Sequence, residues 1–489
     1  MIALRPIHIL LLATLVAFGA SLAAPFHLDD YALFSDPAIT SPSGWWEVWK
    51  PLQTRPLTWF TFWINFQLGG RNSAGYHAVS LALHLAAVWL VYATLRSGVT
   101  GNDGTGSSVP SEARGQRCLS PIMAAAVFAL HPIQAEAVNY VFDRGTLLAT
   151  VFCLLTLRSW RREREWHAAG WFALALLSKE ECVTFPVFLR LAARAWRPAM
   201  GVMFGLSAAA GARLLVATAA VRGSGAGVQA GIAPLEYLGT QGLVILRYLR
   251  LLVAPYGFTV DPDIRISHAW WAWAVILGVA ALLWWRHRHG WWFAAGLILL
   301  APSSTILPAA DLAADRRLYL PMLAFAALAG LLLERFDRRL GVALAGVLLV
   351  LSFGRTQTWA SEQSLWREAV ERAPNKVRPL IQYARTCEPR LALQVLERAK
   401  SLAPDDPRVA TERGRRYLEW GQPAAALGEF GRALALAPND PQAVNNRGVA
   451  LLLLGQKDAA VADFRRALRL EPSFPDAAAN LKRLGVEVR

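Results

Sequence analysis

The chain has 489 residues, of which 55% are hydrophobic and 17% are charged, and its formal net charge at pH 7 is +15. Soluble domains usually carry about 25% charged residues, so this composition argues against a wholly soluble protein. The four cysteines have no paired spacing, which argues against a disulfide framework and against a zinc site.

The positive charge could indicate a nucleic-acid partner. Many of the arginines, however, lie in short loops between apolar segments. This distribution is typical of membrane proteins, whose cytoplasmic loops are rich in arginine and lysine. We therefore expect contact with membrane lipid and no nucleic-acid partner.

Apolar segments follow one another through residues 1–355. A helix that spans a membrane needs about 20 mostly apolar residues, and fewer where it packs on its neighbours. The segment 235–253 could be a span, a re-entrant element or an interfacial helix, because Arg247 and Arg250 lie on it. Without it, about eleven spans are predicted, at 7–24, 76–95, 121–131, 146–157, 167–177, 182–195, 199–221, 270–285, 291–307, 318–333 and 340–353. The first segment could pass for a signal peptide, but the many spans that follow favour an uncleaved helix.

Positive charge predicts how these spans are oriented, since basic loops stay in the cytoplasm. An inside N-terminus and eleven spans place the loops 25–75, 131–145, 222–268 and 308–317 on the outer face, together with the C-terminus. The basic residues then predicted to be cytoplasmic are Arg96, Arg114, Arg117, 158–164, Arg194, Arg197, 286–289 and 335–339.

Residues 356–489 repeat with a period of 34 residues. Small residues where two helices cross, and a proline after the second helix, are typical of tetratricopeptide repeats. The sequence predicts three clear repeats and an irregular first one, forming a concave surface for a protein or peptide. A structural stalk and a dimerisation platform are the alternatives. The matching positions are Gly414 and Gly448, Phe430 and Phe464, and Pro438 and Pro472; earlier copies carry Ala392, Ala399 and Pro404, and Trp366, Ala369 and Pro374.

The predicted fold class is therefore all-α. A polytopic membrane helical bundle occupies residues 1–355, and an α-solenoid of tetratricopeptide repeats occupies residues 356–489.

The first outer loop begins with two adjacent carboxylates, Asp29 and Asp30, directly after a span. Charges near hydrocarbon are costly, so such a pair is unusual. One carboxylate could act as a general base while the other positions it, or the pair could hold a metal. The simpler interpretation is a solvated loop with a helix cap.

Polar residues also gather in three later segments. Pro132 can start a helix after His131, and Glu136 and Tyr140 then share one helix face. Arginine suits phosphate, because its planar fork donates two hydrogen bonds to phosphate oxygens. The other polar residues are Asn139, Asp143 and Arg144, then Lys179, Glu180 and Glu181, then Asp311, Asp315, Arg316 and Arg317. We find no Walker loop, no HExxH and no dinucleotide fingerprint, and no metal site is assigned.

The order of these motifs resembles the transmembrane-and-tetratricopeptide-repeat O-mannosyltransferase family and its bacterial relatives, which are glycosyltransferases of the GT-C superfamily. The resemblance is strongest at 131–149, at 311–321 and in the repeats. The residues that carry it are Asp29 and Asp30, Arg55-Pro56-Leu57, Gly75-Tyr76-His77, His131 to Glu136 with Arg144, Ser178-Lys179-Glu180, 247–255 and Asp315-Arg316-Arg317 with Tyr319.

The resemblance implies a GT-C-like membrane domain that transfers a hexose such as mannose, with inversion, from a polyprenyl-phosphate donor to a hydroxyl of a protein. It implies a base at Asp29 or Asp30. It also implies an active site and repeats on the periplasmic side of a bacterial inner membrane. The cationic support for the donor phosphate maps to Arg316, Arg317, Arg144 and Lys179, and the site is shaped by His131, Glu136, Glu180, Arg55 and Tyr319.

Two other functions stay open at this point. A non-catalytic membrane scaffold could use the repeats to recruit envelope proteins. A transferase could instead act on lipid or polysaccharide, with the repeats serving assembly. The Asp315-Arg316-Arg317 pattern and the small number of repeats depart from the eukaryotic members, so the sugar and the acceptor are not fixed.

Overall fold

The structure is a computed structural model that describes residues 5–50, 53–99, 119–193, 196–220, 227–287, 289–304 and 307–487. The described residues form an all-α protein, as predicted. Arg114, Arg117, Arg194 and the start of the 222–268 loop lie outside these ranges.

The chain divides into two compact units, Met1–Ser361 and Glu362–Arg489. The division falls later than the predicted boundary at residue 355. The last helix of the first unit, α17 (Arg338–Thr358), continues past that point, and Trp359 then packs edge-on against His27 of the same unit.

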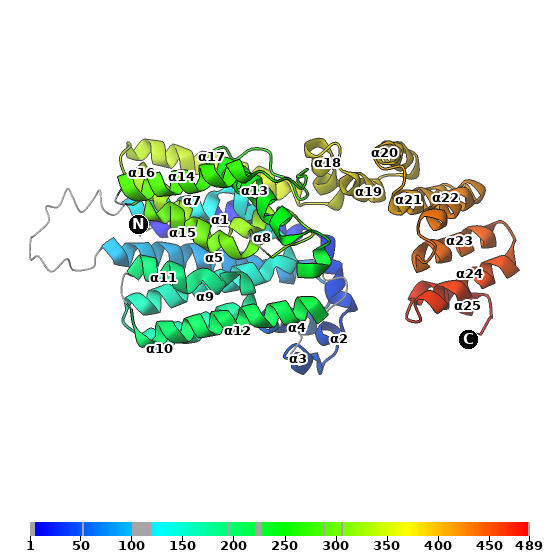
Figure 1. Cartoon of the computed structure of the whole chain (residues 1–489), viewed down its shortest axis with the longest axis horizontal. Coiled ribbons are helices and arrows are strands. Elements are labelled where there is room, and N and C mark those ends of the chain that lie inside the picture. Colours follow the sequence, from blue (N-terminus) through cyan, green and yellow to red (C-terminus); the bar gives the residue numbers. More distant parts are fainter. Residues whose placement is uncertain are drawn as a thin grey trace, which may run out of the picture. The chain divides into compact units, whose positions relative to one another are not determined.

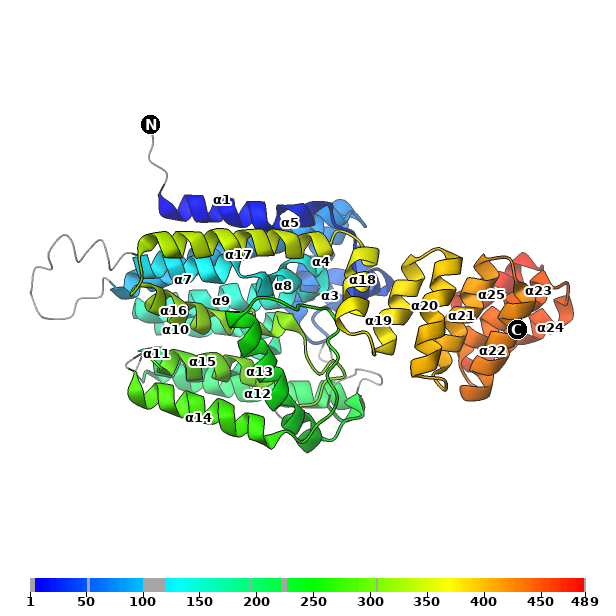
Figure 2. The same cartoon turned by 90° about the horizontal axis from the view of Figure 1, so that it is seen from above.

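The long helices of the first unit mostly run along one direction (Figures 1 and 2). They are α1 (Pro6–Phe18), α5 (Ser73–Val99), α7 (Leu119–Leu130), α9 (Arg144–Arg161), α10 (Glu165–Ser178), α11 (Phe185–Ala193), α12 (Pro198–Ala220), α13 (Pro234–Val253), α14 (Trp270–Arg286), α15 (Trp291–Leu300), α16 (Met322–Leu333) and α17. The helix α13 instead runs across this direction in Figure 2.

Shorter elements connect these helices. Before α5 they are η1 (Gly19–Ala23), η2 (Leu28–Ser35), α2 (Pro37–Thr40), α3 (Gly44–Glu47) and α4 (Pro56–Gly69). The later ones are η3 (Pro132–Gln134), α8 (Ala135–Asn139), η4 (Val141–Asp143), η5 (Glu180–Thr184), η6 (Gly227–Ala230), η7 (Ala301–Ser303) and η8 (Asp315–Leu318).

Several helices are apolar enough to lie in a membrane. Four pass on both length and composition: Pro6–Ala23, Ser73–Arg96, Pro198–Ala219 and Arg338–Thr358. A fifth arises if Pro121–Leu130 and Pro132–Asn139, which meet at a bend of 49°, count as one broken span. The other segments proposed from the sequence also form helices in the described ranges, but they do not meet this test, so the number eleven stays a prediction.

The helix α13 shows why its two arginines are tolerated. Arg247 forms an ion pair with Asp315 at 2.6 Å, and Arg250 donates to the carbonyl of Tyr256 at 3.1 Å. Both charges therefore have partners within the unit. Whether α13 crosses the membrane stays open.

The loops of the first unit sort into two groups at opposite ends of the bundle. At one end, Arg197 donates to the carbonyl of Trp160 at 3.0 Å, and Arg161 donates to that of Thr94 at 2.5 Å. These bonds join the basic loops after α9 and α11 to the C-terminal half of α5. At the other end, His27 Nε2 lies 2.8 Å from the carbonyl oxygen of Trp359. The first unit thus ends beside the loop that carries Asp29 and Asp30.

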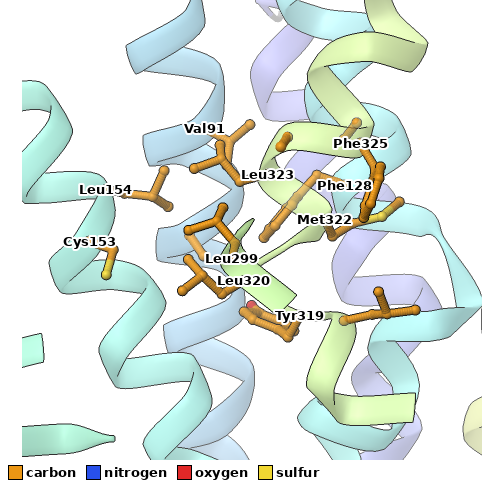
Figure 3. Close-up of a cluster of buried hydrophobic side chains, with 14 of the residues drawn as sticks. Val91, Phe128, Cys153, Leu154, Leu299, Tyr319, Leu320, Met322, Leu323 and Phe325 are labelled. Carbon is orange, nitrogen blue, oxygen red and sulfur yellow. The ribbon is translucent and has the colours of Figure 1, made fainter. Parts of the chain in front are cut away.

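A cluster of buried apolar side chains holds the centre of the bundle (Figure 3). Val91, Phe128, Leu154 and Leu323 meet there from four different helices. Tyr319 lies at its edge with no exposed surface. The segment that carries Arg316 and Arg317 is therefore anchored in the core.

The second unit is a series of antiparallel helix pairs. Its helices are α18 (Glu362–Arg372), α19 (Val377–Thr386), α20 (Pro389–Leu402), α21 (Pro407–Glu419), α22 (Pro423–Leu436), α23 (Pro441–Leu453), α24 (Lys457–Leu470) and α25 (Pro475–Arg483). The pairs α19–α20, α21–α22 and α23–α24 match the three predicted repeats, and α18 carries Trp366 and Ala369 of the irregular copy.

The repeated glycines are sites of close helix approach. A Cβ atom on Gly414 would lie 2.5 Å from the Phe430 ring, and one on Gly448 would lie 2.7 Å from the Phe464 ring. Glycine and phenylalanine recur at a spacing of 34 residues because the same helix–helix contact is formed in two successive repeats.

Replacement of Gly414 by Ala should destabilise the repeats by about 1–3 kcal/mol, because the added methyl group overpacks the contact with Phe430. Gly428→Ala is a matched control in the partner helix, since nothing lies within 4 Å of its Cβ position. Hydrogen–deuterium exchange of α21 and α22 in the full chain should be faster in the first variant and not in the second. Equal exchange in both variants would contradict the packing argument.

Candidate active site

Asp29 and Asp30 are neighbours in sequence but have different surroundings. Asp29 is exposed, whereas Asp30 is 0% exposed. Asp30 Oδ2 accepts from the His27 N–H at 2.9 Å, and its Oδ1 accepts from the Phe142 N–H at 2.7 Å. Asp30 is thus a buried capping residue that joins the start of the 25–75 loop to the segment after α8. Asp29 is the carboxylate that a substrate can reach.

The Asp29 carboxylate is held by a tyrosine from a distant part of the chain. The Tyr140 hydroxyl donates to Asp29 Oδ2 at 2.8 Å, and the Asp29 N–H lies 3.4 Å from the same hydroxyl. The pKa of Tyr140 is raised by burial and by the charge of Asp29, so the phenol stays protonated and keeps donating.

The backbone also holds Asp29 in an unusual way. Leu28, directly before it, has φ +53°, and Arg55 has φ +58°. A left-handed conformation is costly for a residue with a side chain, and such residues gather at functional sites. Both lie in the 25–75 loop.

Arg316 contacts the ring of the same tyrosine. Its guanidinium carbon is 5.6 Å from the centre of the Tyr140 ring, and its side chain is 23% exposed. Its Nη1 donates to Glu136 Oε1 at 2.5 Å, and its N–H donates to Glu136 Oε2 at 3.3 Å. Asp311 Oδ2 lies 3.6 Å from Arg316 Nη2, and Asp143 Oδ1 lies 4.0 Å from Arg316 Nε. One cation is therefore held by carboxylates and partly open to solvent.

The chain of charges continues to α9 and η5. Lys179 Nζ donates to Asp143 Oδ1 at 2.7 Å and to Thr146 Oγ1 at 2.5 Å, and it lies 3.2 Å from Glu181 Oε2. Its side chain is only 5% exposed. Lys179 thus neutralises Asp143, which also lies within 4.0 Å of Arg316, and it contacts a ligand less readily than Arg316 does.

Arg55 and Glu180 form a second pair beside this network, with Arg55 Nε 2.9 Å from Glu180 Oε2. Burial raises the pKa of the Glu180 carboxyl, but the opposing effect of the charge and hydrogen bonds of Arg55 is larger. The net result is a pKa of about 2. The pair stays ionised at any physiological pH, and it joins the first outer loop to η5.

The structure does not bring every predicted residue to an accessible surface. Arg144 is 0% exposed, donates to the carbonyls of Thr61 and Tyr76, and stacks 4.4 Å from the Phe62 ring. Arg317 is 9% exposed and donates to the carbonyls of Asp311 and Leu312. Both guanidinium groups tie loops together inside the unit. A phosphate would have to displace these internal bonds to reach them.

His131 and Tyr319 are also interior. His131 Nδ1 accepts from the Ile133 N–H at 3.1 Å, which starts η3. The Tyr319 hydroxyl lies 2.7 Å from His84 Nδ1. Their predicted role in shaping the site stays a prediction.

A mainly apolar cavity of about 300 Å³ opens next to the Arg55–Glu180 pair. Leu176 and Leu177 of α10 and Leu206 and Leu214 of α12 line it. Arg213, also in its wall, donates to the carbonyl of Gln53. The cavity is apolar along its length and charged at one edge.

Sequence reasoning placed Tyr140, Asp143 and Asp311 in the right segments but did not choose them as site residues. The spacing of Glu136 and Tyr140 on one helix face was the available signal for Tyr140. Within the part of the chain that the structure describes, no group of three His, Cys, Asp or Glu side chains could hold a metal ion.

The comparisons with known proteins agree with the motifs. The tetratricopeptide repeat family model matches residues 441–474. The protein O-mannosyl-transferase Tmtc1 of Drosophila melanogaster is 35% identical over 137 residues, which cover 27% of this chain and 14% of the relative. The chain is similar to protein O-mannosyl-transferases. The human protein O-mannosyl-transferase TMTC1 is 28% identical over 173 residues, which cover 32% of this chain and 18% of the relative.

The matched regions span less than a fifth of these relatives' own lengths. The crystal structure of MamA is 18% identical, with a TM-score of 0.22, over 25% of this chain and 77% of that chain. A TM-score this low adds nothing to the argument. These relatives confirm the resemblance noted in the sequence. The name O-mannosyl-transferase describes the relatives themselves.

The burial of Asp30 leads to one expected pH effect. Burial raises the pKa of Asp30 from 3.8 to about 7, although the N–H groups of His27 and Phe142 oppose the shift. Between about pH 4 and pH 7 the folded state then binds more protons at this site than the unfolded state, so stability should fall as the pH rises. Asp30→Asn cannot titrate, so the decline in Tm across this window should be smaller in the variant. Parallel Tm curves for the two proteins would contradict this assignment.

Proposed function

We propose that this chain is a membrane glycosyltransferase that transfers a hexose such as mannose from a polyprenyl phosphate to a hydroxyl of a protein, with inversion at the anomeric carbon. One observation carries the proposal. An exposed carboxylate, Asp29, and a partly exposed guanidinium, Arg316, both contact Tyr140, the first at its hydroxyl and the second at its ring. A base and a cation at one site are what this reaction needs.

The reaction would proceed in one displacement. The acceptor hydroxyl attacks the anomeric carbon, the bond from that carbon to the phosphate oxygen breaks, and Asp29 takes the hydroxyl proton. General base catalysis contributes about 10²–10⁴-fold. Negative charge grows on the leaving phosphate, and Arg316 is placed to stabilise it. Glu136 holds Arg316 in position through one hydrogen bond from the guanidinium and one from the backbone N–H.

The apolar cavity between α10 and α12 suits a prenyl chain. Its walls carry leucine and alanine side chains, and Arg55 and Glu180 lie at its edge. A lipid phosphate has the same division between an apolar tail and an anionic head. The ion pairs of Lys179 and Arg316 continue from this edge toward Asp29. The donor would therefore lie with its tail in the cavity and its phosphate near Arg316.

A protein acceptor would be presented by the tetratricopeptide repeats. Trp359, two residues before the end of the first unit, lies beside His27 at the end that carries Asp29. This supports the proposal that the repeats and the site share the outer side of the membrane. The relatives named above are animal proteins, so placement in a bacterial inner membrane rests on the sequence alone.

Incubation of the purified chain with polyprenyl-phosphate mannose and extracted envelope proteins tests the proposal. We expect a hexose mass increase on serine or threonine of the acceptor protein. A scaffold would give no transfer, and that outcome would end the proposal. Sugar found on lipid or polysaccharide instead would favour the second enzymatic function. Deletion of 411–489 should abolish transfer to protein while binding of the donor remains.

A further inference from the structure

A second cavity lies at the opposite end of the first unit from the candidate active site. Its volume is about 410 Å³, and residues from the start of α1, the end of α5 and the end of α9 line it. Arg158 follows Asp143 by some four turns of helix, which is about 20 Å along α9. The cavity is thus separate from the network around Arg316.

Three arginines face this cavity, and its lining contains no carboxylate. Arg158 lies 5.5 Å from the Trp89 ring, and Arg96 lies 6.0 Å from the Tyr92 ring. Arg5 precedes the first turn of α1 and lines the same space. Within the described residues, none of the three arginines forms an ion pair with a carboxylate. Among the described residues, an anion would therefore meet guanidinium groups that no carboxylate pairs with.

The surroundings favour an anion that is attached to a lipid. Trp89 is 46% exposed, and α1 presents Ile9, Leu12 and Val16 outward, each more than half exposed. These side chains begin within a turn of the cavity and continue along a helix that is apolar enough to span a membrane. Tryptophan next to arginine is also typical of the headgroup level of a bilayer. Acyl chains could lie on α1 while the headgroup enters the cavity.

We propose that this cavity binds the phosphate of an anionic phospholipid headgroup. A planar guanidinium donates two hydrogen bonds to phosphate oxygens, and the aromatic rings keep Arg96 and Arg158 in place without neutralising them. The chemistry recognised is a phosphate group, and free phosphate is its other possible source. The site requires no transfer activity and is independent of the proposed function.

The test compares the detergent-purified full chain with two double variants of equal charge. Arg96→Gln with Arg158→Gln removes two cavity arginines. Arg338→Gln with Arg339→Gln removes two exposed arginines at the same end of the bundle, outside the cavity. Phosphatidylglycerol is titrated, and binding is followed by native mass spectrometry. Each arginine near a bilayer surface contributes roughly fivefold to the binding of anionic lipid, so the cavity variant should bind about 30-fold more weakly.

Wild type and the control variant should bind alike, and phosphatidylcholine should bind weakly to both. Equal weakening in both double variants would show general surface charge and overturn the proposal. Inorganic phosphate that competes at millimolar concentration would identify free phosphate as the ligand and overturn the lipid assignment. Arg96→Lys with Arg158→Lys keeps both positive charges, so comparing it with the glutamine pair separates the loss of charge from a folding defect. If it binds no better than the glutamine pair, the proposal also fails.

Discussion

Asp29→Asn is expected to lower the rate of sugar transfer by about 10²–10⁴-fold, because an amide cannot take the proton of the acceptor hydroxyl. The change should leave stability nearly intact, since Asp29 is exposed and its contact with Tyr140 can be kept by the amide oxygen. The measurement is the initial rate of transfer from polyprenyl-phosphate mannose, together with the Tm of each protein.

Asp30→Asn provides the contrast at the neighbouring position. Its two carboxylate oxygens accept from the N–H groups of His27 and Phe142, and an amide offers only one acceptor oxygen. We expect a lower Tm and a modest loss of rate. If Asp30→Asn abolishes transfer in a protein with unchanged Tm while Asp29→Asn remains active, the base has been assigned to the wrong carboxylate.

Arg316→Gln should lower the rate by about 10²–10³-fold, since it removes the cation that supports the leaving phosphate. It should also destabilise the protein by about 3–5 kcal/mol, because Glu136 is 2% exposed and would lose its charged partner. Loss of activity alone could therefore reflect loss of structure.

The double variant Glu136→Gln with Arg316→Gln separates the two effects. Removing both charges avoids a buried unpaired carboxylate, so much of the stability should return. Activity should not return, because the phosphate still lacks its cation. A double variant that recovers both Tm and transfer rate would show that Arg316 is structural. Calorimetry and the same transfer assay provide the two readouts.

Local patterns in the sequence predicted a large part of the fold. The 34-residue spacing predicted the helix pairs of the repeats, because each glycine must accept a phenylalanine ring from the partner helix. Runs of apolar residues predicted where helices lie in the first unit, because a helix in a membrane or a core needs an apolar surface over its length. Neither inference requires knowledge of which helices are neighbours.

The broken helix at His131 shows a limit of this approach. The sequence predicted a span that ends at residue 131, followed by an outer loop, 131–145, in which Pro132 can start a helix. The structure continues through η3 and α8 with a bend of 49° and buries both elements. Hydropathy treats Glu136 as a loop residue, whereas its ion pair with Arg316 allows it to lie inside.

The sequence by itself determined which segments bring charged and polar residues to the candidate site: the acidic pair, the segment after His131, the lysine turn and the arginine pair. Only the tertiary structure distinguished Asp29 from Asp30 and Arg316 from Arg317. Adjacent residues in a loop have the same local context, and their burial depends on partners far along the chain. Asp30 accepts a hydrogen bond from the N–H of Phe142, 112 residues away, and Arg316 donates to Glu136, 180 residues away. Such contacts exist only once the helices have packed.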